Sequence, residues 1–145
     1  MKKAGYRFLE HTADVSVEAQ GRNLEEAFEQ TAYSLMETIT PSLRILSSEI
    51  ERTITIEAED KEALLFDFLT EFLYLFDVEE LIFNKIDIQP IKKEQEKYHL
   101  VAYVKGTKFN KNKHEPGTEV KAITYSFMKI EENAKGVIIN IVFDI

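Results

Sequence analysis

Residues 61–77 constrain the fold more than any other segment, because they have the length of a helix and are apolar on almost every side. A helix that is apolar around most of its circumference must be covered on most of its sides. Its apolar run at 63–76 is too short to cross a bilayer and carries two acidic residues. We therefore expect a helix over about 61–77 inside a globular fold, with Asp60 as its N-cap. The polar positions that fall on its one polar face are Asp67, Thr70, Glu71 and Tyr74.

A second helix is predicted at about 24–39, before Pro41. The preceding sequence "NLEE" is typical of a capping box, in which Asn23 caps the helix and Glu26 reaches back to it. Alternation of apolar and polar residues predicts the strands of the protein. They are expected at 6–20, 50–59, 80–91, 97–106, 118–131 and 136–144.

The order of these elements predicts an α+β fold, formed as one domain over residues 1–145, with two helices packed on mixed or antiparallel β-sheets. A length of 145 residues and a hydrophobic fraction of 44% are enough for a sizeable core. The N-terminal segment has no apolar stretch typical of a signal peptide. We expect a soluble cytoplasmic protein with no membrane contact.

Composition excludes several kinds of function. The net charge of −8 argues against broad nonspecific binding of nucleic acid, which depends on lysine and arginine. The absence of cysteine excludes disulfides, a thiol nucleophile and a thiolate zinc site. The sequence also lacks the G-x-S-x-G, P-loop and H-E-x-x-H motifs. A self-sufficient nucleophilic or nucleotide-cleaving enzyme is therefore not indicated.

The C-terminal strand, 136–144, ends in two neighbouring negative charges. Its two faces are both largely apolar, so we expect a central, covered strand in which Asp144 is partly desolvated. The α-carboxylate of Ile145 lies one residue away, and Asp14 lies in the first predicted strand. If the two strand ends meet, three oxygen donors converge, a set suited to Ca²⁺ or Mg²⁺ rather than zinc. A solvated chain end explains the same residues more simply.

Other candidate residues have ordinary explanations beside functional ones. His11 lies on the apolar side of segment 6–20, where a core histidine is commoner than a ligand. The loop 107–117 carries three lysines and His114, which suit a phosphate or an acidic partner surface, although a solvated loop fits equally well. Lys121, in a predicted strand, is a candidate phosphate contact. Glu71 is a candidate border of the site, and a structural role is the commoner explanation for it.

Four segments together resemble the archease family. They are "YRFLEHTADV" (6–15), "LLFDFLTEFLYLF" (64–76), "EVKAITY" (119–125) and the terminal "VFDI" (142–145). The resemblance implies a cytosolic protein cofactor of the RtcB-class RNA ligase, which joins tRNA exon halves and other broken RNA ends. Such a cofactor promotes guanylylation of the ligase and multiple turnover without catalysing ligation. It is linked to tRNA and GTP through the ligase, and direct RNA contact is left open.

The resemblance also implies a bound divalent metal, calcium in the family, with Mg²⁺ or Mn²⁺ as alternatives. The family's ligands fall here on Asp14, Asp144 and Ile145. The chain departs from the family pattern at Thr107 and Asn110, where an acidic pair is usual, and at Ser126, where histidine is common. Two other functions fit the residues: a metal-dependent phosphoester hydrolase, and a chaperone-like module that binds apolar segments.

Overall fold

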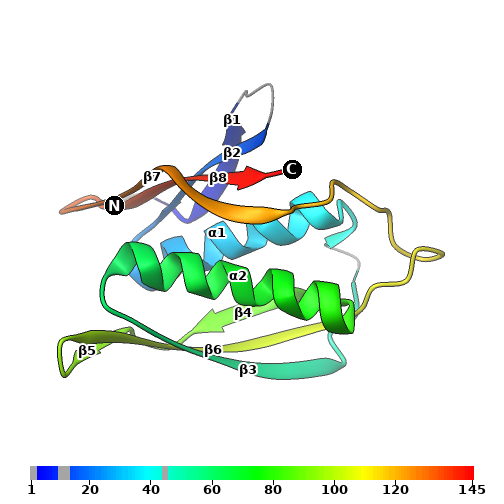
Figure 1. Cartoon of the computed structure of the whole chain (residues 1–145), viewed down its shortest axis with the longest axis horizontal. Helices are drawn as coiled ribbons and strands as arrows, with labels where there is room; N and C mark the ends of the chain where they lie inside the picture. Colours follow the sequence, from blue (N-terminus) through cyan, green and yellow to red (C-terminus); the bar gives the residue numbers. More distant parts are fainter. Residues whose placement is uncertain (1–2, 10–13, 44–45) are drawn as a thin grey trace.

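The computed structural model describes residues 3–9, 14–43 and 46–145. It has three layers, in which two helices lie between two antiparallel sheets (Figure 1). The helix α1, Leu24–Ile39, packs on β2 and β8 of one sheet and on β4 of the other, and the helix α2, Lys61–Glu79, contacts strands of both. The predicted α+β fold is therefore confirmed. Among the described residues, no helix is long and apolar enough to cross a membrane.

The first sheet joins both ends of the chain. Its strands, in spatial order, are β1 (Gly5–Leu9), β2 (Asp14–Gly21), β8 (Gly136–Asp144) and β7 (Ala122–Asn133). The prediction of one strand over 6–20 is wrong, because this range contains parts of two separate strands, β1 and β2, which pair antiparallel. The alternation of apolar residues continues in phase from one strand to the next, and the sequence has no glycine or proline between them to separate the two strands.

The second sheet lies on the other side of the helices. Its main strands, in spatial order, are β3 (Ile50–Ala58), β6 (Lys97–Lys108) and β4 (Leu81–Ile88). A short strand that the sequence did not predict, β5 (Lys92–Glu94), folds back onto the start of β6. The pairing of β4 with β6 shifts register between Phe83 and Lys85. The edge of this sheet at β4 is covered by α1.

Both helices begin where the sequence predicts. The Asn23 side chain accepts a hydrogen bond from the Glu26 N–H at 2.8 Å, and the Asp60 side chain accepts one from the Ala63 N–H at 2.7 Å. Glu26, however, does not complete a capping box with Asn23. Its carboxylate accepts a hydrogen bond from the Arg22 N–H at 3.1 Å and binds the Arg22 guanidinium at 2.6 Å. Hydrogen bonds to a charged guanidinium are stronger than one to a neutral N–H, so the Glu26 carboxylate binds Arg22 rather than the Asn23 N–H.

The core lies between the two sheets, around the helix layer. Phe68 in α2 lies 6.4 Å from Phe28 in α1 and 5.0 Å from Phe72, between ring centroids. Phe72 in turn meets Phe83 of β4 at 5.8 Å. A continuous chain of fully buried aromatic rings therefore connects both helices to the second sheet. This explains why α2 is apolar on nearly all sides. The predicted polar stripe of α2 faces outward, with Asp67, Thr70 and Tyr74 exposed and Glu71 half-buried.

Three side chains of α1 cover the edge of β4. The Ile86 N–H donates to the Tyr33 hydroxyl at 2.9 Å, and the Ile88 N–H donates to the Glu29 carboxylate at 2.8 Å. Glu25 accepts a third hydrogen bond, from the N–H of Ile91 just beyond β4, at 2.7 Å. Residues four apart on one helix face thus bond to successive outward N–H groups, and α1 takes the place of a neighbouring strand.

Strand β7 carries a wide bulge. Thr124 pairs with Val142 of β8, and the next pair joins Lys129 to Asn140, so residues 125–128 are displaced from the ladder. Phe127, at the centre, has φ 61° and an 82% exposed side chain. A bulky residue in the left-handed region is strained. The sequence predicts one regular strand over 118–131. The structure has β7 over Ala122–Asn133, and the bulge interrupts its regular pairing with β8.

Candidate functional site

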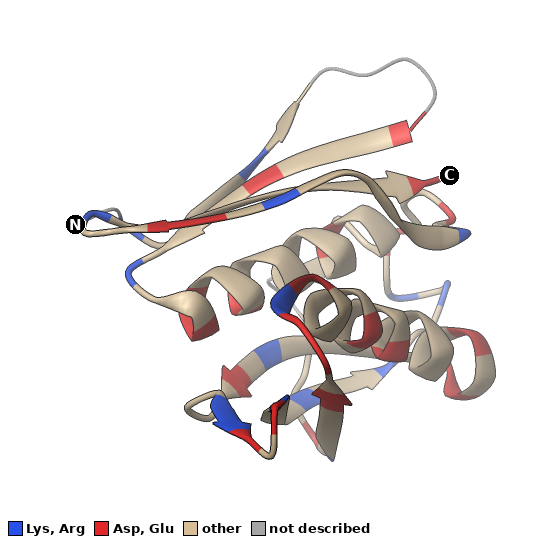
Figure 2. Ribbon diagram, turned by 60° about the vertical axis from the view of Figure 1, so that its left-hand side comes forward, with Lys and Arg blue, Asp and Glu red and all other residues tan. Residues whose placement is uncertain are grey.

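Two aspartates from opposite ends of the chain meet at one end of the first sheet. Asp14 opens β2 and Asp144 closes β8, and the two are direct antiparallel partners. On the other side of β8, the Lys121 N–H donates to the carbonyl of Asp144 at 2.7 Å. Figure 2 shows the acidic ends of these strands beside the C-terminus. Directly opposed residues point their side chains to the same face of a sheet, so the two carboxylates share one surface.

The environments of the two aspartates differ. Asp14 is half-buried, and its carboxylate oxygen Oδ1 is closed off from solvent. Asp144 is exposed, which corrects the expectation that it is partly desolvated. The reason is that the outer face of β8 is covered at Val142 but opens at its last residue. Like charges directly opposed across a sheet destabilise it unless something offsets their repulsion.

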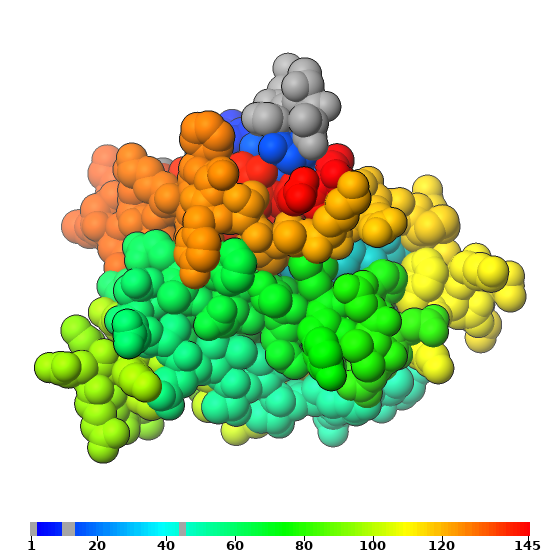
Figure 3. Space-filling view, viewed as in Figure 1, coloured from blue at the N-terminus to red at the C-terminus, as the bar shows by residue number. Residues whose placement is uncertain are grey.

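The terminal residue is held against the fold. The Ile145 side chain is half-buried and packs on the hydrophobic core, which argues against a fraying chain end. The space-filling view shows the C-terminal residues reaching the surface between β7 and β2 (Figure 3). The residue that follows Asp144 is therefore anchored on the core.

This donor set fits a hard divalent cation. Two carboxylates on one face and a neighbouring α-carboxylate supply only oxygen donors, which Ca²⁺, Mg²⁺ and Mn²⁺ prefer. Among the His, Asp and Glu residues that the structure describes, no three come close enough to hold a metal. Neither Glu71 nor His114 is thus a third ligand beside Asp14 and Asp144. Among the described residues, no His, Asp or Glu side chain therefore takes the place of Ile145 in the expected ligand set.

Comparison with known proteins decides the family. Residues 6–145 match the model of the Archease protein family (MTH1598/TM1083). The chain belongs to the archease family. The archease of Methanosarcina mazei is 38% identical over 140 residues, covering 97% of this chain and 95% of the relative. The archease of Pyrococcus furiosus is 45% identical over 131 residues, covering 90% and 91%.

Solved archease-family structures share the fold. The solution structure of Methanobacterium thermoautotrophicum protein 1598 has a TM-score of 0.85 and 31% identity, over 97% of this chain and 99% of that one. A crystal structure from Thermotoga maritima, described as an archease and possible chaperone, has a TM-score of 0.61 and 26% identity. It covers 100% of this chain and 98% of its own.

Of the other predicted site residues that the structure describes, Lys121 lies beside the aspartate pair, and Glu71 and His114 do not join it. His11 lies outside the described residues. Lys121 adjoins Asp144 through its backbone, and its side chain is exposed. Glu71 is half-buried on the outer face of α2. His114 accepts a hydrogen bond on Nδ1 from the Asn110 N–H at 2.9 Å, so the ring closes a turn of the loop.

Two of the three departures from the family pattern, Thr107 and Asn110, form hydrogen bonds through their side chains, and Ser126 forms one through its backbone N–H. The Thr107 hydroxyl donates to the Glu49 carboxylate at 2.8 Å. Hydrogen bonds from Ser47 and Thr107 lower the pKa of Glu49. The Asn110 side chain accepts from the Asn112 N–H at 2.9 Å and so shapes the loop, and the Ser126 N–H donates to Thr124 Oγ1 at 2.9 Å inside the bulge.

One concave feature was not predicted from the sequence. It is a hollow at the C-terminal ends of both helices, where Asp77 and Glu119 share a wall. Its walls come from three segments far apart in the chain. In the sequence, Asp77 and Glu119 each lie beside apolar residues, but that pattern is common on solvated faces and does not by itself predict a hollow.

Proposed function

We propose that this archease-family chain is a non-enzymatic, metal-binding activator of the RtcB-class RNA ligase in cytoplasmic tRNA splicing and RNA repair. The observation that supports the proposal most is the direct pairing of Asp14 with Asp144 beside the terminal carboxylate. These residues are the ones onto which the family's metal ligands fall. The ligase carries the chemistry, with GTP and broken tRNA as its substrates.

The chain's own residues would prepare a site for one hard cation. Strand pairing fixes the spacing of the Asp14 and Asp144 carboxylates, and packing of Ile145 fixes the chain end. A bound divalent cation would offset the repulsion of these carboxylates and supply positive charge to phosphate oxygens. Ca²⁺ is the proposed ion, and Mg²⁺ and Mn²⁺ fit the same donors. The exposed Lys121 would extend the positive surface towards a phosphate-bearing or acidic face of the ligase.

The test mixes this protein with a cognate RtcB-class ligase, radiolabelled GTP, divalent metal and a broken tRNA. It follows labelling of the ligase and the number of turnovers. Wild type should stimulate both, and the variants D14N and D144N should lose most of the stimulation because each removes a charged donor at nearly constant shape. A chain that ends at Phe143 should behave like them. The control variant E94Q removes one exposed carboxylate elsewhere and should stimulate fully.

Full stimulation by both D14N and D144N would contradict the proposal. Phosphoester hydrolysis without the ligase, lost in D144N, would favour the hydrolase instead.

A chaperone-like role is the second candidate, because one related structure is described as a possible chaperone. The exposed Phe127 and Leu9 border a shallow hollow above β8 and give an apolar surface for such binding. Suppression of a model client's aggregation that D14N leaves intact and F127S abolishes would favour this role over ligase activation.

A further inference from the structure

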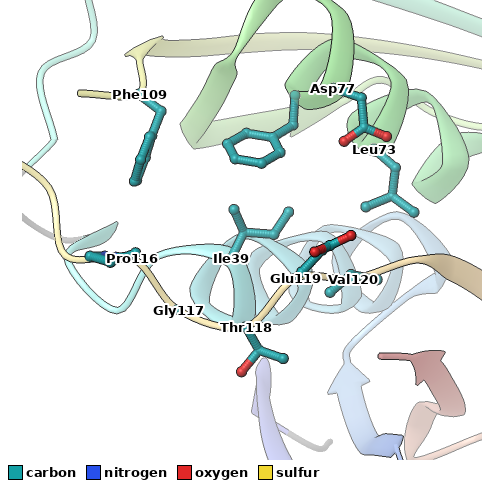
Figure 4. Close-up of a pocket in the computed structure, with 10 residues that line it drawn as sticks. Ile39, Leu73, Asp77, Phe109, Pro116, Gly117, Thr118, Glu119 and Val120 are labelled. Carbon is teal, nitrogen blue, oxygen red and sulfur yellow. The ribbon is translucent and has the colours of Figure 1, made fainter. Parts of the chain in front are cut away.

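The hollow at the ends of the helices is a candidate site separate from the aspartate pair. It has a volume of about 370 Å³ and lies where α1 and α2 both end, against the connection between β6 and β7. In Figure 4, Phe109 stands on one side, Ile39 below, and Asp77 and Glu119 on the other side. Neither Asp14 nor Asp144 lines it.

The walls of the hollow are held by backbone hydrogen bonds. The Gly117 N–H donates to the Ile39 carbonyl and the Thr118 N–H to the Thr38 carbonyl, each at 2.8 Å. A Cβ on Gly117 would lie 2.2 Å from the Thr38 oxygen, so glycine is required for this approach. The opposite wall is fixed by the Phe109 N–H, which donates to the Glu80 carbonyl at 2.7 Å. The hollow is therefore formed before any ligand binds, which lowers the cost of binding.

The hollow is apolar and aromatic on the side away from its acidic wall. Phe76 and Phe109 meet edge to face, with 5.8 Å between ring centroids and 79° between planes. Ile39, Leu73 and Val120 supply aliphatic surface. Aromatic faces attract cations, and aliphatic surface accommodates the methylene stem of a long cationic side chain.

The charge of the hollow is wholly negative. Asp77 and Glu119 are the charged residues among its lining, and within the described chain neither forms an ion pair or a side-chain hydrogen bond. The C-terminal ends of both helices lie here, and the helix dipoles add partial negative charge. Neither helix has a basic residue in its last turn to offset that charge. Lys108 and Lys111 line a separate hollow that also contacts Phe109.

We propose that this hollow receives an arginine side chain from a basic segment of a protein partner. The guanidinium would bind the Asp77 and Glu119 carboxylates, and its stem would lie on the apolar floor beside Phe109. Arginine is favoured over lysine because its planar group both stacks on aromatic rings and bonds carboxylates through several N–H groups. The proposal is independent of metal binding at Asp14 and Asp144.

The test titrates the peptide acetyl-Gly-Arg-Gly-amide into ¹⁵N-labelled full-length protein in EDTA and follows amide shifts by NMR. Saturable shifts are expected at Phe109, Val120 and Asp77. The matched peptide with citrulline, which is neutral and nearly the same shape, should bind about tenfold more weakly or worse, since hydrogen bonds to charged groups are the stronger ones. The presence of EDTA keeps the outcome separate from the metal proposal.

Two double variants complete the test. D77N/E119Q should weaken binding of the arginine peptide at least about tenfold. The control E59Q/E94Q removes the same charge at exposed sites elsewhere and should bind like wild type. Equal binding of the citrulline peptide, unchanged binding by D77N/E119Q, or shifts that map to another surface would each overturn the proposal. Shifts of the same amides on dilution of the protein alone would overturn it too, because a second copy would then be the occupant.

Discussion

At the scale of single residues, Gly106 shows how a missing side chain shapes the second sheet. It is buried in β6, opposite the place where β4 shifts register. A Cβ built on Gly106 would lie 1.8 Å from the Ile82 carbonyl oxygen and 2.6 Å from Phe83 Cα. Both of these atoms belong to the backbone, which cannot turn away as a side chain would. The bulge of β4 therefore depends on glycine at this position.

We predict that G106A lowers the free energy of unfolding by about 3 kcal/mol, the upper part of the usual range for overpacking a core. Urea denaturation monitored by circular dichroism measures the loss. G5A is the matched control, because nothing lies within 4 Å of a Cβ at that position, and it should change stability by less than about 0.5 kcal/mol. Equal stability of G106A and wild type would show that the two strands can move apart at no cost.

At the scale of elements, the contact of α1 with β4 makes stability depend on pH. Burial raises the pKa of Glu29, opposed by the hydrogen bond from the Ile88 N–H and reinforced by nearby Asp87, Glu26 and Glu25. The folded state therefore binds the Glu29 proton more tightly than the unfolded state. Its contribution to stability is fully present below the unfolded-state pKa and is lost as the pH rises through the raised value.

The variant E29Q tests this dependence. Glutamine keeps an oxygen that can accept from the Ile88 N–H but never ionises. The free energy of unfolding of E29Q minus that of wild type should therefore increase between pH 4 and pH 7, as measured by urea denaturation at each pH. E59Q, at an exposed position, should show a nearly constant difference. A flat or falling difference for E29Q would contradict the assigned cause.

The elements differ in how far sequence predicts them. The helices have Asn23 and Asp60 as their N-caps, as expected, because an N-cap acts through bonds within one turn. The hairpin of β1 and β2 and the bulge before Lys129 were missed, because both depend on which strand lies alongside. Alternation of apolar and polar residues shows which face of a strand is buried, but it does not show which strand pairs with it.

The candidate sites differ in the same way. The meeting of Asp14 and Asp144 could be predicted from the sequence only in part, because Asp144 ends a predicted strand whereas Asp14 lies inside the strand predicted over 6–20. The resemblance to the archease family is what named both residues as ligands. Their different solvent exposure could not be predicted, since it depends on the packing around each strand end. The arginine-binding hollow combines Asp77, Phe109 and Glu119 only after the connection between β6 and β7 docks on both helices. The spacing of these residues in the sequence does not predict that docking.

At the scale of the whole molecule, the aspartate pair links the two ends of the chain. Asp14 and Asp144 are neighbours only when β2 and β8 are paired, so a cation that needs both binds the folded state. Such a ligand stabilises the fold by about 2.7 kcal/mol at a hundredfold excess over its Kd.

We predict that Ca²⁺ at this excess raises the Tm of wild type by roughly 5–10 °C relative to EDTA, as measured by scanning calorimetry. In D144N most of this rise should disappear, because one of the three donors has lost its charge. E94Q should retain the rise. An equal shift in D144N would place the stabilising ion elsewhere on this acidic protein.

The hydrogen bonds from β4 to α1 also bear on how copies of this protein behave when crowded together. A sheet edge with open N–H groups is a template on which a strand of another molecule can grow, and repetition of that step builds fibres. Here the N–H groups of Ile86 and Ile88 are already bonded to Tyr33 and Glu29. The helix α1 thereby closes one side of the second sheet to polymerisation, in addition to packing on both sheets.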